Sequence, residues 1–240
     1  MHFFIGLHQP ADAKHFDMCF VSVNRLRTRK GPFAVKQWIM DSGAYTEVSL
    51  YGGYRTSVTE YAALICKWKS NGELLAAVAQ DYPAEAHNLA KTGGTVEDHQ
   101  RWTIERYDDL IAADTGVYIL PALQGQTAAQ YADHVRQYGA RLQPGAWVGV
   151  GGICKRQGKP QDIIEVLRAI LAVRPDLLLH GFGVKTTALR SPEIAEMLTT
   201  ADSMAWSFHA RKNGRNGNSW READAWRRKI LNVNHGVLQA

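Results

Sequence analysis

A regular alternation of short apolar runs with longer amphipathic segments constrains the fold of this chain more than any other feature. Eight runs rich in β-branched or aromatic residues occur at 3–7, 19–23, 38–40, 75–79, 117–123, 147–150, 177–179 and 203–206. Strands that alternate with helices form parallel βαβ units, and eight such strands close most economically into a barrel. The sequence therefore predicts an α/β protein with a single (β/α)8 TIM-type barrel. An open doubly wound sheet is the alternative.

The amphipathic segments carry helix start and stop signals. Ser57 with Glu60 forms a capping box that predicts a helix ending at Asn71-Gly72, and Thr95 opens a second helix. Further helices are predicted at 127–138, 160–173, 192–198 and 219–231. Loops rather than full helices are predicted after the first two strands, so the first units should be irregular. A chain of 240 residues that is 45% hydrophobic can bury one core, so we expect a single domain over residues 1–240.

Acidic residues stand beside three of the predicted strands. Asp41 follows the run 38–40, Asp81 follows the run 75–79, and Asp202 precedes the run 203–206. Because strand ends converge on one rim of a barrel, we expect these three carboxylates to share a pocket. A helix cap or a turn is the alternative role for any one of them.

Positive charge is concentrated in two clusters, within a formal net charge of +5. The first contains Arg25, Arg27, Arg29 and Lys30, and the second contains Arg211, Lys212, Arg215, Arg221, Arg227, Arg228 and Lys229. Such clusters indicate a polyanionic partner, and a solvated basic face is the alternative. The interleaved rings of Trp206, Trp220 and Trp226 favour nucleic acid, because bases stack on exposed rings.

The cysteines and the apolar runs limit which classes of protein the chain can belong to. Cys19, Cys66 and Cys154 are odd in number and widely spaced, which predicts buried reduced thiols and no structural metal. No apolar run approaches 18 residues, and the start lacks a basic segment followed by a long apolar region. We therefore expect a soluble cytoplasmic protein with no membrane partner.

The segment 41–50, DSGAYTEVSL, resembles the DSGG(F/Y)Q signature of the tRNA-guanine transglycosylases, which exchange guanine in a polynucleotide for a 7-deazaguanine. Five further segments resemble that family's motifs in the same order: QDYP at 80–83, ALQG at 122–125, GVGGI at 149–153, HGFGV at 180–184 and RKNGRNG at 211–217. The match spans roughly residues 38–217. The chain lacks the family's zinc-binding insertion, and segments 6–16 and 22–30 look more like the DpdA-type branch, which acts on DNA.

This resemblance implies replacement of guanine by a preQ0-like 7-deazaguanine in DNA, through a covalent Asp-sugar intermediate and without a cofactor. Base exchange passes through a cationic sugar, so a carboxylate near the anomeric carbon and an acid or base near the purine are needed. By resemblance Asp202 is the nucleophile and Asp41 the general acid/base. Spacing back from Arg211 would instead place Ala205 at the nucleophile position, which would make the chain a non-catalytic relative.

The resemblance also implies a base pocket. Its members are Tyr45, Asp81, Gln124, Gly151, Gly152, Phe182 and Gly183. Asp81 would accept hydrogen bonds from the guanine N1–H and 2-amino group, while Gln124 and the amides of Gly151 and Gly152 would serve O6. Tyr45 and Phe182 would stack on the purine, with barrel packing as the alternative for each ring.

Partner contacts follow from the basic residues near the strand ends and the C-terminus. Arg25, Arg211, Lys212 and Arg215 are predicted to contact phosphates, and His8 and Asn24 are candidate rim residues. The expected partners are DNA and a free 7-deazaguanine base, with tRNA as the alternative polynucleotide and an accessory protein or a second copy of the chain as a further partner. A silent nucleic-acid-binding subunit and a small-molecule barrel enzyme remain as other functions.

Overall fold

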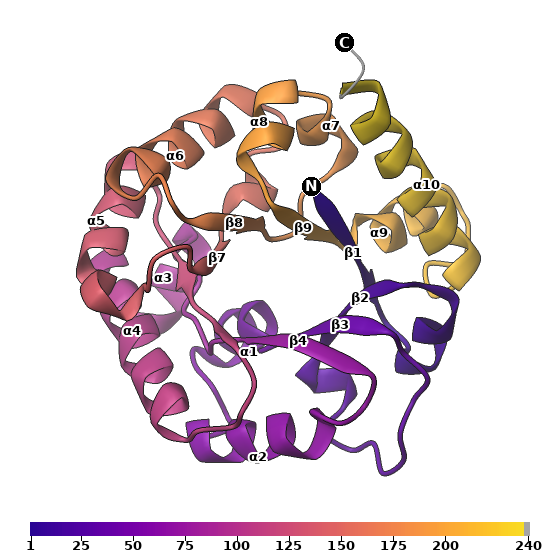
Figure 1. Cartoon of the computed structure of the whole chain (residues 1–240), viewed down its shortest axis with the longest axis horizontal. Coiled ribbons are helices and arrows are strands. Elements are labelled where there is room, and N and C mark those ends of the chain that lie inside the picture. Colours follow the sequence, from indigo (N-terminus) through magenta and orange to yellow (C-terminus); the bar gives the residue numbers. More distant parts are fainter. Residues whose placement is uncertain (238–240) are drawn as a thin grey trace.

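The computed structural model describes residues 1–237 and forms an all-parallel barrel ringed by helices (Figure 1). Its strands are β1 His2–Leu7, β2 Met18–Ser22, β3 Gln37–Asp41, β4 Glu73–Val78, β5 Ile119–Leu120, β6 Ala122–Leu123, β7 Trp147–Val150, β8 Leu178–Gly181 and β9 Thr200–Ser203. They are hydrogen-bonded in the order β5-β4-β3-β2-β1-β9-β8-β7-β6. The predicted α/β class and TIM-type barrel are confirmed. The single domain over 1–240 remains a prediction, and its last three residues lie outside the described range.

One position in the barrel is divided into two short strands by a proline. The sheet therefore has nine strands, and its two ends, β5 and β6, are consecutive in the chain. β5 pairs with β4 and β6 pairs with β7, and the two short strands are separated only by Pro121. Proline has no N–H to donate to a neighbouring strand, so the ladder of backbone hydrogen bonds is interrupted at this residue. Its carbonyl still accepts a hydrogen bond from the Gly149 amide. Residues 119–123 therefore fill one place in the barrel, as the single predicted run 117–123 implied.

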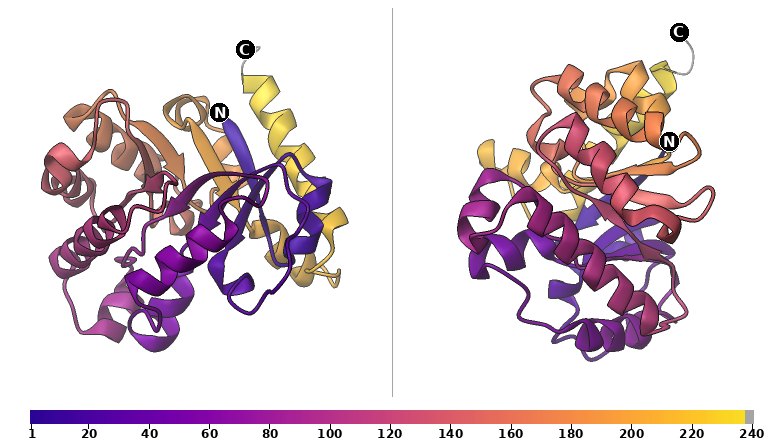
Figure 2. Two further views of the ribbon diagram at one scale, coloured as in Figure 1. Left: turned by 60° about the horizontal axis from the view of Figure 1, so that its bottom comes forward. Right: turned by 90° about the vertical axis from the view of Figure 1, so that its left-hand side faces the viewer.

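The described residues form ten α-helices, most of which cover the outside of the barrel. They are α1 Ala44–Tyr51, α2 Val58–Trp68, α3 Ala86–Thr92, α4 Val96–Ala112, α5 Ala128–Tyr138, α6 Pro160–Val173, α7 Thr186–Leu189, α8 Pro192–Met197, α9 Ala205–Lys212 and α10 Trp220–Val237. Helix α1 lies at the end of the barrel where a cavity opens. The capping box at Ser57 and Glu60 is formed, and Thr95 makes another with Asp98. Figure 2 shows α10 alongside β1, where it completes the ring of helices.

The irregular first units are also confirmed. β1 is followed by the 3-10 helix η1 Pro10–His15, and β2 by the 3-10 turn η2 Val23–Arg25. These short connections leave the strand ends on this side of the barrel free of a long helix.

The last strand was predicted in the wrong place. β9 is Thr200–Ser203, and the apolar residues Ala205 and Trp206 of the predicted run 203–206 begin α9 instead. Asp202 therefore lies within a strand rather than before one. The reason is that β9 turns two polar side chains, Thr200 and Asp202, toward the barrel interior, so it does not read as an apolar run.

Two apolar clusters follow from the alternation of side chains along each strand. One set of strand residues, such as Ile5, Val21 and Met40, packs beneath the helices. The other set fills the barrel, and it contains Phe4, Phe20, Ile39, Ala76, Val78 and Leu120, with Trp147 and Phe182 packed against it. The interior is thus mainly apolar and aromatic. Polar side chains that face it do so in an environment that penalises unpaired groups.

No helix among residues 1–237 is long and apolar enough to cross a membrane.

Candidate active site

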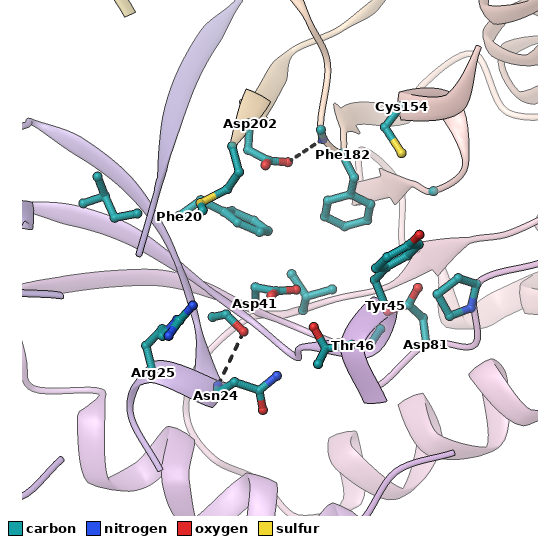
Figure 3. Close-up of a pocket in the computed structure, with 18 of the residues that line it drawn as sticks. Phe20, Asn24, Arg25, Asp41, Tyr45, Thr46, Asp81, Cys154, Phe182 and Asp202 are labelled. Carbon is teal, nitrogen blue, oxygen red and sulfur yellow. Dashed lines mark hydrogen bonds between the residues drawn. The ribbon is translucent and has the colours of Figure 1, made fainter. Parts of the chain in front are cut away.

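A cavity of about 670 Å³ opens at the carboxyl ends of the strands. Its volume lies within the range of small-molecule pockets, about 300–1,000 Å³. Asp41, Asp81 and Asp202 all line it, and Figure 3 shows their side chains directed into the same space from three parts of the barrel. The expectation that these carboxylates share one pocket agrees with the structure.

Asp41 ends β3 and, two residues after the interior residue Ile39, faces the cavity. Gly43 follows with φ of +75°, a conformation that glycine adopts without strain, and this turn begins α1. Burial raises the pKa of Asp41 to about 6, and the Asp202 charge adds to that rise, although hydrogen bonds from Ser22 and the Gly43 amide oppose it. Asp41 can therefore hold or release a proton near neutral pH.

Asp81 follows β4 and is buried at the cavity floor. Its Oδ2 accepts a hydrogen bond of 2.5 Å from Gln124 Nε2. Burial, followed by the charge of Asp41, raises the pKa of Asp81 to about 7, against the effect of Gln124. Gln124 Oε1 is buried and has no hydrogen-bond partner among the described residues. Gln124 therefore holds the Asp81 carboxyl in place through its amide nitrogen.

Asp202 is held by two donors that share one of its oxygens. The Gly183 amide donates to Oδ1 at 3.0 Å, and His180 Nε2 lies 3.3 Å from the same atom. Oδ2 makes no hydrogen bond within the described residues. The alternative nucleophile position, Ala205, is the first residue of α9 and does not line the cavity.

Aromatic rings from different elements flank these acids. Tyr45 on α1 is 47% exposed and lines the cavity, where Lys155 Nζ donates to its hydroxyl at 3.2 Å. Phe182 follows β8 and also lines the cavity, with Phe20 of β2 close to it at 6.1 Å between ring centroids. A side chain at Gly149 would collide with the Phe182 ring. Gly149 thus leaves room for that ring.

The predicted glycines form cavity walls, but one of them lacks its predicted role. Gly151, Gly152 and Gly183 line the cavity. The Gly151 amide, however, donates to the Leu123 carbonyl at 2.9 Å as part of the strand ladder, so it is not available to a base. Gln124 also differs from expectation, because its amide nitrogen is committed to Asp81 and its oxygen is the free atom.

One edge of the cavity is cationic. Arg25 lines it, and its Nη2 lies 3.4 Å from His8 Nδ1. His8 Nε2 lies 2.7 Å from Ser207 Oγ, and Arg211 Nη1 donates to that oxygen at 2.6 Å. Burial, followed by the charges of Arg25 and Arg211, lowers the pKa of His8. The lowered pKa favours the neutral form of His8, which links Arg25 to Ser207 and, through it, to Arg211.

A second pair of arginines lies on the same edge. Arg27 and Arg55 both line the cavity, and both pair with Glu47, whose side chain is fully buried on α1. The distances to Glu47 Oε1 are 3.4 Å from Arg27 and 2.9 Å from Arg55. Two cations share one carboxylate, so a net positive charge remains here.

The C-terminal basic cluster takes part in several ion pairs. Arg211, Lys212 and Arg215 are exposed but do not line the cavity, and Arg215 pairs with Glu222 at 2.9 Å. Arg227 and Arg228 both pair with Asp224. Ion pairs thus neutralise part of this cluster.

The tryptophans do not form the predicted stacking surface. Trp206 is buried and donates from Nε1 to the Gly6 carbonyl at 2.7 Å. Trp220 and Trp226 are partly buried against the core, where Trp220 stacks on His15. The exposed ring of this region is Phe208, which is 65% exposed. The face of the helix on which each tryptophan lies decides its burial, because Trp206 in α9 and Trp220 and Trp226 in α10 are on the faces that pack against the core.

The cysteines are all free, but only Cys19 is fully buried. Cys19 is buried, Cys154 lines the cavity, and Cys66 is exposed, contrary to the expectation of three buried thiols. Burial raises the pKa of Cys154 to about 11, so its thiol stays protonated at neutral pH. Among the described residues, no group of three or more His, Cys, Asp or Glu side chains is arranged to hold a metal.

Several residues that line the cavity or support it were not predicted as members of the site, although Arg27 belongs to the first basic cluster. Ser22, Arg27, Arg55 and Cys154 line the cavity, and His180 lies beneath Asp202. Ser22 stands at the end of a predicted strand, so the rule that found Asp41 would have found it. His180 is a polar residue at the end of an apolar run, which is a comparable signal. Arg55 lies in a loop, and no pattern identifies it.

Comparison with known proteins adds to this geometry. A search of curated proteins finds none that matches the chain. A family model does match, over residues 1–235, and its description is DpdA, DeoxyPurine in DNA protein A. The match covers the barrel, all three cavity carboxylates and the cationic edge. The chain therefore belongs to the DpdA family.

Proposed function

We propose that this chain replaces guanine in DNA with a free 7-deazaguanine of the preQ0 type, through a covalent intermediate between Asp202 and the sugar. Membership of the DpdA family implies a role in 7-deazaguanine modification of DNA and suggests a DNA transglycosylase. The observation that carries the finer proposal is the convergence of Asp41, Asp81 and Asp202 on one cavity flanked by aromatic rings.

The free oxygen of Asp202 supports its role as nucleophile. In the first half-reaction, Oδ2 bonds to C1′ while the bond from C1′ to the guanine N9 breaks, and Asp41 gives its proton to the departing base. In the second, N9 of the incoming base bonds to C1′, its proton passes to Asp41, and the bond to Asp202 breaks. One base leaves and one enters, so the cycle consumes no water and no oxidant.

The cavity floor supports recognition of a guanine-like edge. Asp81 lines the cavity with a carboxyl group, whose oxygens complement the N1–H and 2-amino donors of guanine and of 7-deazaguanines. The Gly152 amide would serve O6. Tyr45 and Phe182 provide flat faces, and stacking contributes about 1–3 kcal/mol per base.

The charge distribution supports a polynucleotide substrate. The floor is acidic, whereas the edge with Arg25, Arg27 and Arg55 is cationic. A nucleotide that leaves the duplex would place its base on the floor and its phosphates at the edge.

Base exchange is measured by incubating the purified chain with labelled guanine and either duplex DNA or bulk tRNA. We expect label in DNA, no label with Asp202→Asn, and normal labelling with Asp17→Asn, an exposed aspartate at the opposite end of β2 paired with Lys36. A denaturation-resistant complex between wild-type protein and DNA, absent in Asp202→Asn, would identify the covalent intermediate.

Other outcomes select other functions. Label in tRNA alone would favour the tRNA reaction. Salt-sensitive DNA binding without any exchange would favour a silent binding subunit. Full exchange by Asp202→Asn would remove the nucleophile from the proposal.

A further inference from the structure

A chain of polar side chains runs through the apolar barrel interior to Asp202. Trp147 Nε1 lies 2.8 Å from Thr200 Oγ1, and Thr200 Oγ1 lies 2.8 Å from His180 Nδ1. His180 Nε2 then lies 3.3 Å from Asp202 Oδ1. The chain links β7, β8 and β9, and none of its members before Asp202 lines the cavity.

The chemistry of the end groups decides the direction of the two outer hydrogen bonds. The Trp147 indole can only donate, so Thr200 accepts from it. A carboxylate can only accept, so the hydrogen on the His180 ring facing Asp202 must be on Nε2. A neutral ring then has a bare Nδ1, which accepts the remaining hydroxyl hydrogen of Thr200. Each donor and acceptor finds a partner in this single arrangement.

The surroundings of His180 keep its ring in place. Its side chain is fully buried. The Phe20 ring stacks on it at 5.7 Å between centroids, and Phe182 and Trp147 meet it edge-on at 4.9 and 5.9 Å. A ring enclosed by three others cannot swing away from Asp202 without moving the core. An apolar residue would fill this space at a lower desolvation penalty, so the polar chain needs a reason beyond packing.

We propose that His180, fixed by Thr200 and Trp147, is a positioning residue that holds Oδ1 of Asp202 and so directs Oδ2 toward the sugar. This inference rests on the proposed function, because it assigns the chain to the orientation of the nucleophile. The Gly183 amide supplies the second donor to Oδ1. Two fixed donors on one oxygen restrict rotation of the carboxylate, and the unpartnered oxygen is the reactive one.

Two substitutions at His180 distinguish the hydrogen bond that Nε2 makes to Asp202 from the one that Nδ1 makes to Thr200. In His180→Gln the amide can reach the position of Nε2 and still donate to Asp202. In His180→Asn the shorter amide reaches only the position of Nδ1, so it can contact Thr200 but not Asp202. Both lose the same aromatic packing. We expect the rate of covalent intermediate formation to fall about 10- to 100-fold further in His180→Asn than in His180→Gln, the range found when a supporting hydrogen-bond partner is removed.

Thr200 provides a second pair that disturbs the core less. Thr200→Ser keeps the hydroxyl, and Thr200→Val replaces it with a methyl group of similar size. We expect the single-turnover rate to fall in Thr200→Val and to stay close to the wild-type rate in Thr200→Ser. The affinities for DNA and for the free base should be unchanged in both variants. In ¹⁵N-labelled wild-type protein, the His180 ring should show a protonated Nε2 and an unprotonated Nδ1, and this pattern should change in Thr200→Val.

The outcomes distinguish this inference from the function beneath it. If the wild-type chain exchanges no base, the proposed function fails and the positioning role fails with it. If the wild-type chain exchanges base and His180→Asn is as fast as His180→Gln, only the positioning role fails. Rates that follow thermal stability across all four variants, or a ring protonated on Nδ1, would also overturn it.

Discussion

The buried position of Asp81 disfavours the ionised form of its carboxyl group. Burial raises its pKa from 3.8 to about 7, so the folded protein keeps a proton that the unfolded chain releases between about pH 4 and 7. The free energy of unfolding therefore has its full value below pH 4 and decreases as the pH rises from 4 to 7. Asp81→Asn should remove this loss. At pH 8 we expect the variant to be more stable by about 1–4 kcal/mol, since one pKa unit corresponds to about 1.4 kcal/mol.

Urea unfolding at pH 4 and pH 8 measures this difference. The two proteins should be nearly equal at pH 4. A variant that is less stable than wild type at pH 8 would show that the Asp81 carboxylate stabilises the fold, contrary to the effect of its burial.

The same group should couple base binding to pH. If ionised Asp81 accepts from N1–H and the 2-amino group, affinity for free guanine should rise as pH increases through about 7, and binding below pH 7 should release a proton. Calorimetry in two buffers of different ionisation enthalpy measures that proton. Affinity that is flat from pH 6 to 8 would remove Asp81 from base recognition.

Gly149 leaves space for the Phe182 ring, which gives a third prediction. Gly149→Ala should displace the ring and weaken binding of the free base about 5- to 100-fold, which corresponds to the loss of a stacked face. Gly158→Ala is the matched control, because nothing lies within 4 Å of the added carbon. Equal base affinity in the two variants would assign Phe182 to packing alone.

At the scale of elements, α1 is anchored to the cavity edge by one buried acid. Glu47 pairs with Arg27 and Arg55, and the Arg55 amide also donates to it at 3.2 Å. Hydrogen bonds from Arg55 are the main reason that the pKa of Glu47 is lowered. Glu47→Gln leaves both guanidinium groups without a counter-charge, and we expect it to cost about 2–4 kcal/mol of stability, less than a fully buried pair because both arginines reach solvent.

Chemical unfolding measures that cost, and Asp133→Asn, which affects an exposed pair with Arg136, is the control. Because α1 carries Tyr45, Glu47→Gln should also weaken base binding. A loss of stability under 1 kcal/mol would show that the two arginines are adequately solvated without Glu47.

The elements differed in how well their sequences identified them. The helix 160–173 was predicted at its observed bounds, and both capping residues, Ser57 and Thr95, begin helices. These signals are local, because a cap satisfies the N–H groups of its own helix. β9 was misplaced because Thr200 and Asp202 are polar and face the interior, an environment that only the closed barrel creates.

For the whole molecule, the separation of charge predicts how DNA binding depends on salt. Removing one cation that binds a phosphate should reduce the slope of log affinity against log salt by about 0.9 on duplex DNA. We expect this change in Arg25→Gln, at the cavity edge, and none in Lys36→Gln, whose partner Asp17 lies at the far end of β2. Binding titrations at several salt concentrations measure both slopes. Equal slopes for the two variants would remove the cavity edge from the DNA interface.

The sequence alone determined the barrel class, the rhythm of its strands and helices, and the three aspartates, because side-chain periodicity, caps and strand ends are properties of neighbouring residues. Only the tertiary structure decided which of the predicted groups already have hydrogen-bond or packing partners within the protein. The Gly151 amide is taken by the barrel ladder, the C-terminal tryptophans are taken by packing, and His180 is aligned with Asp202 from a neighbouring strand. Contacts of this kind join residues far apart in the chain, so they exist only after strand closure brings those residues together.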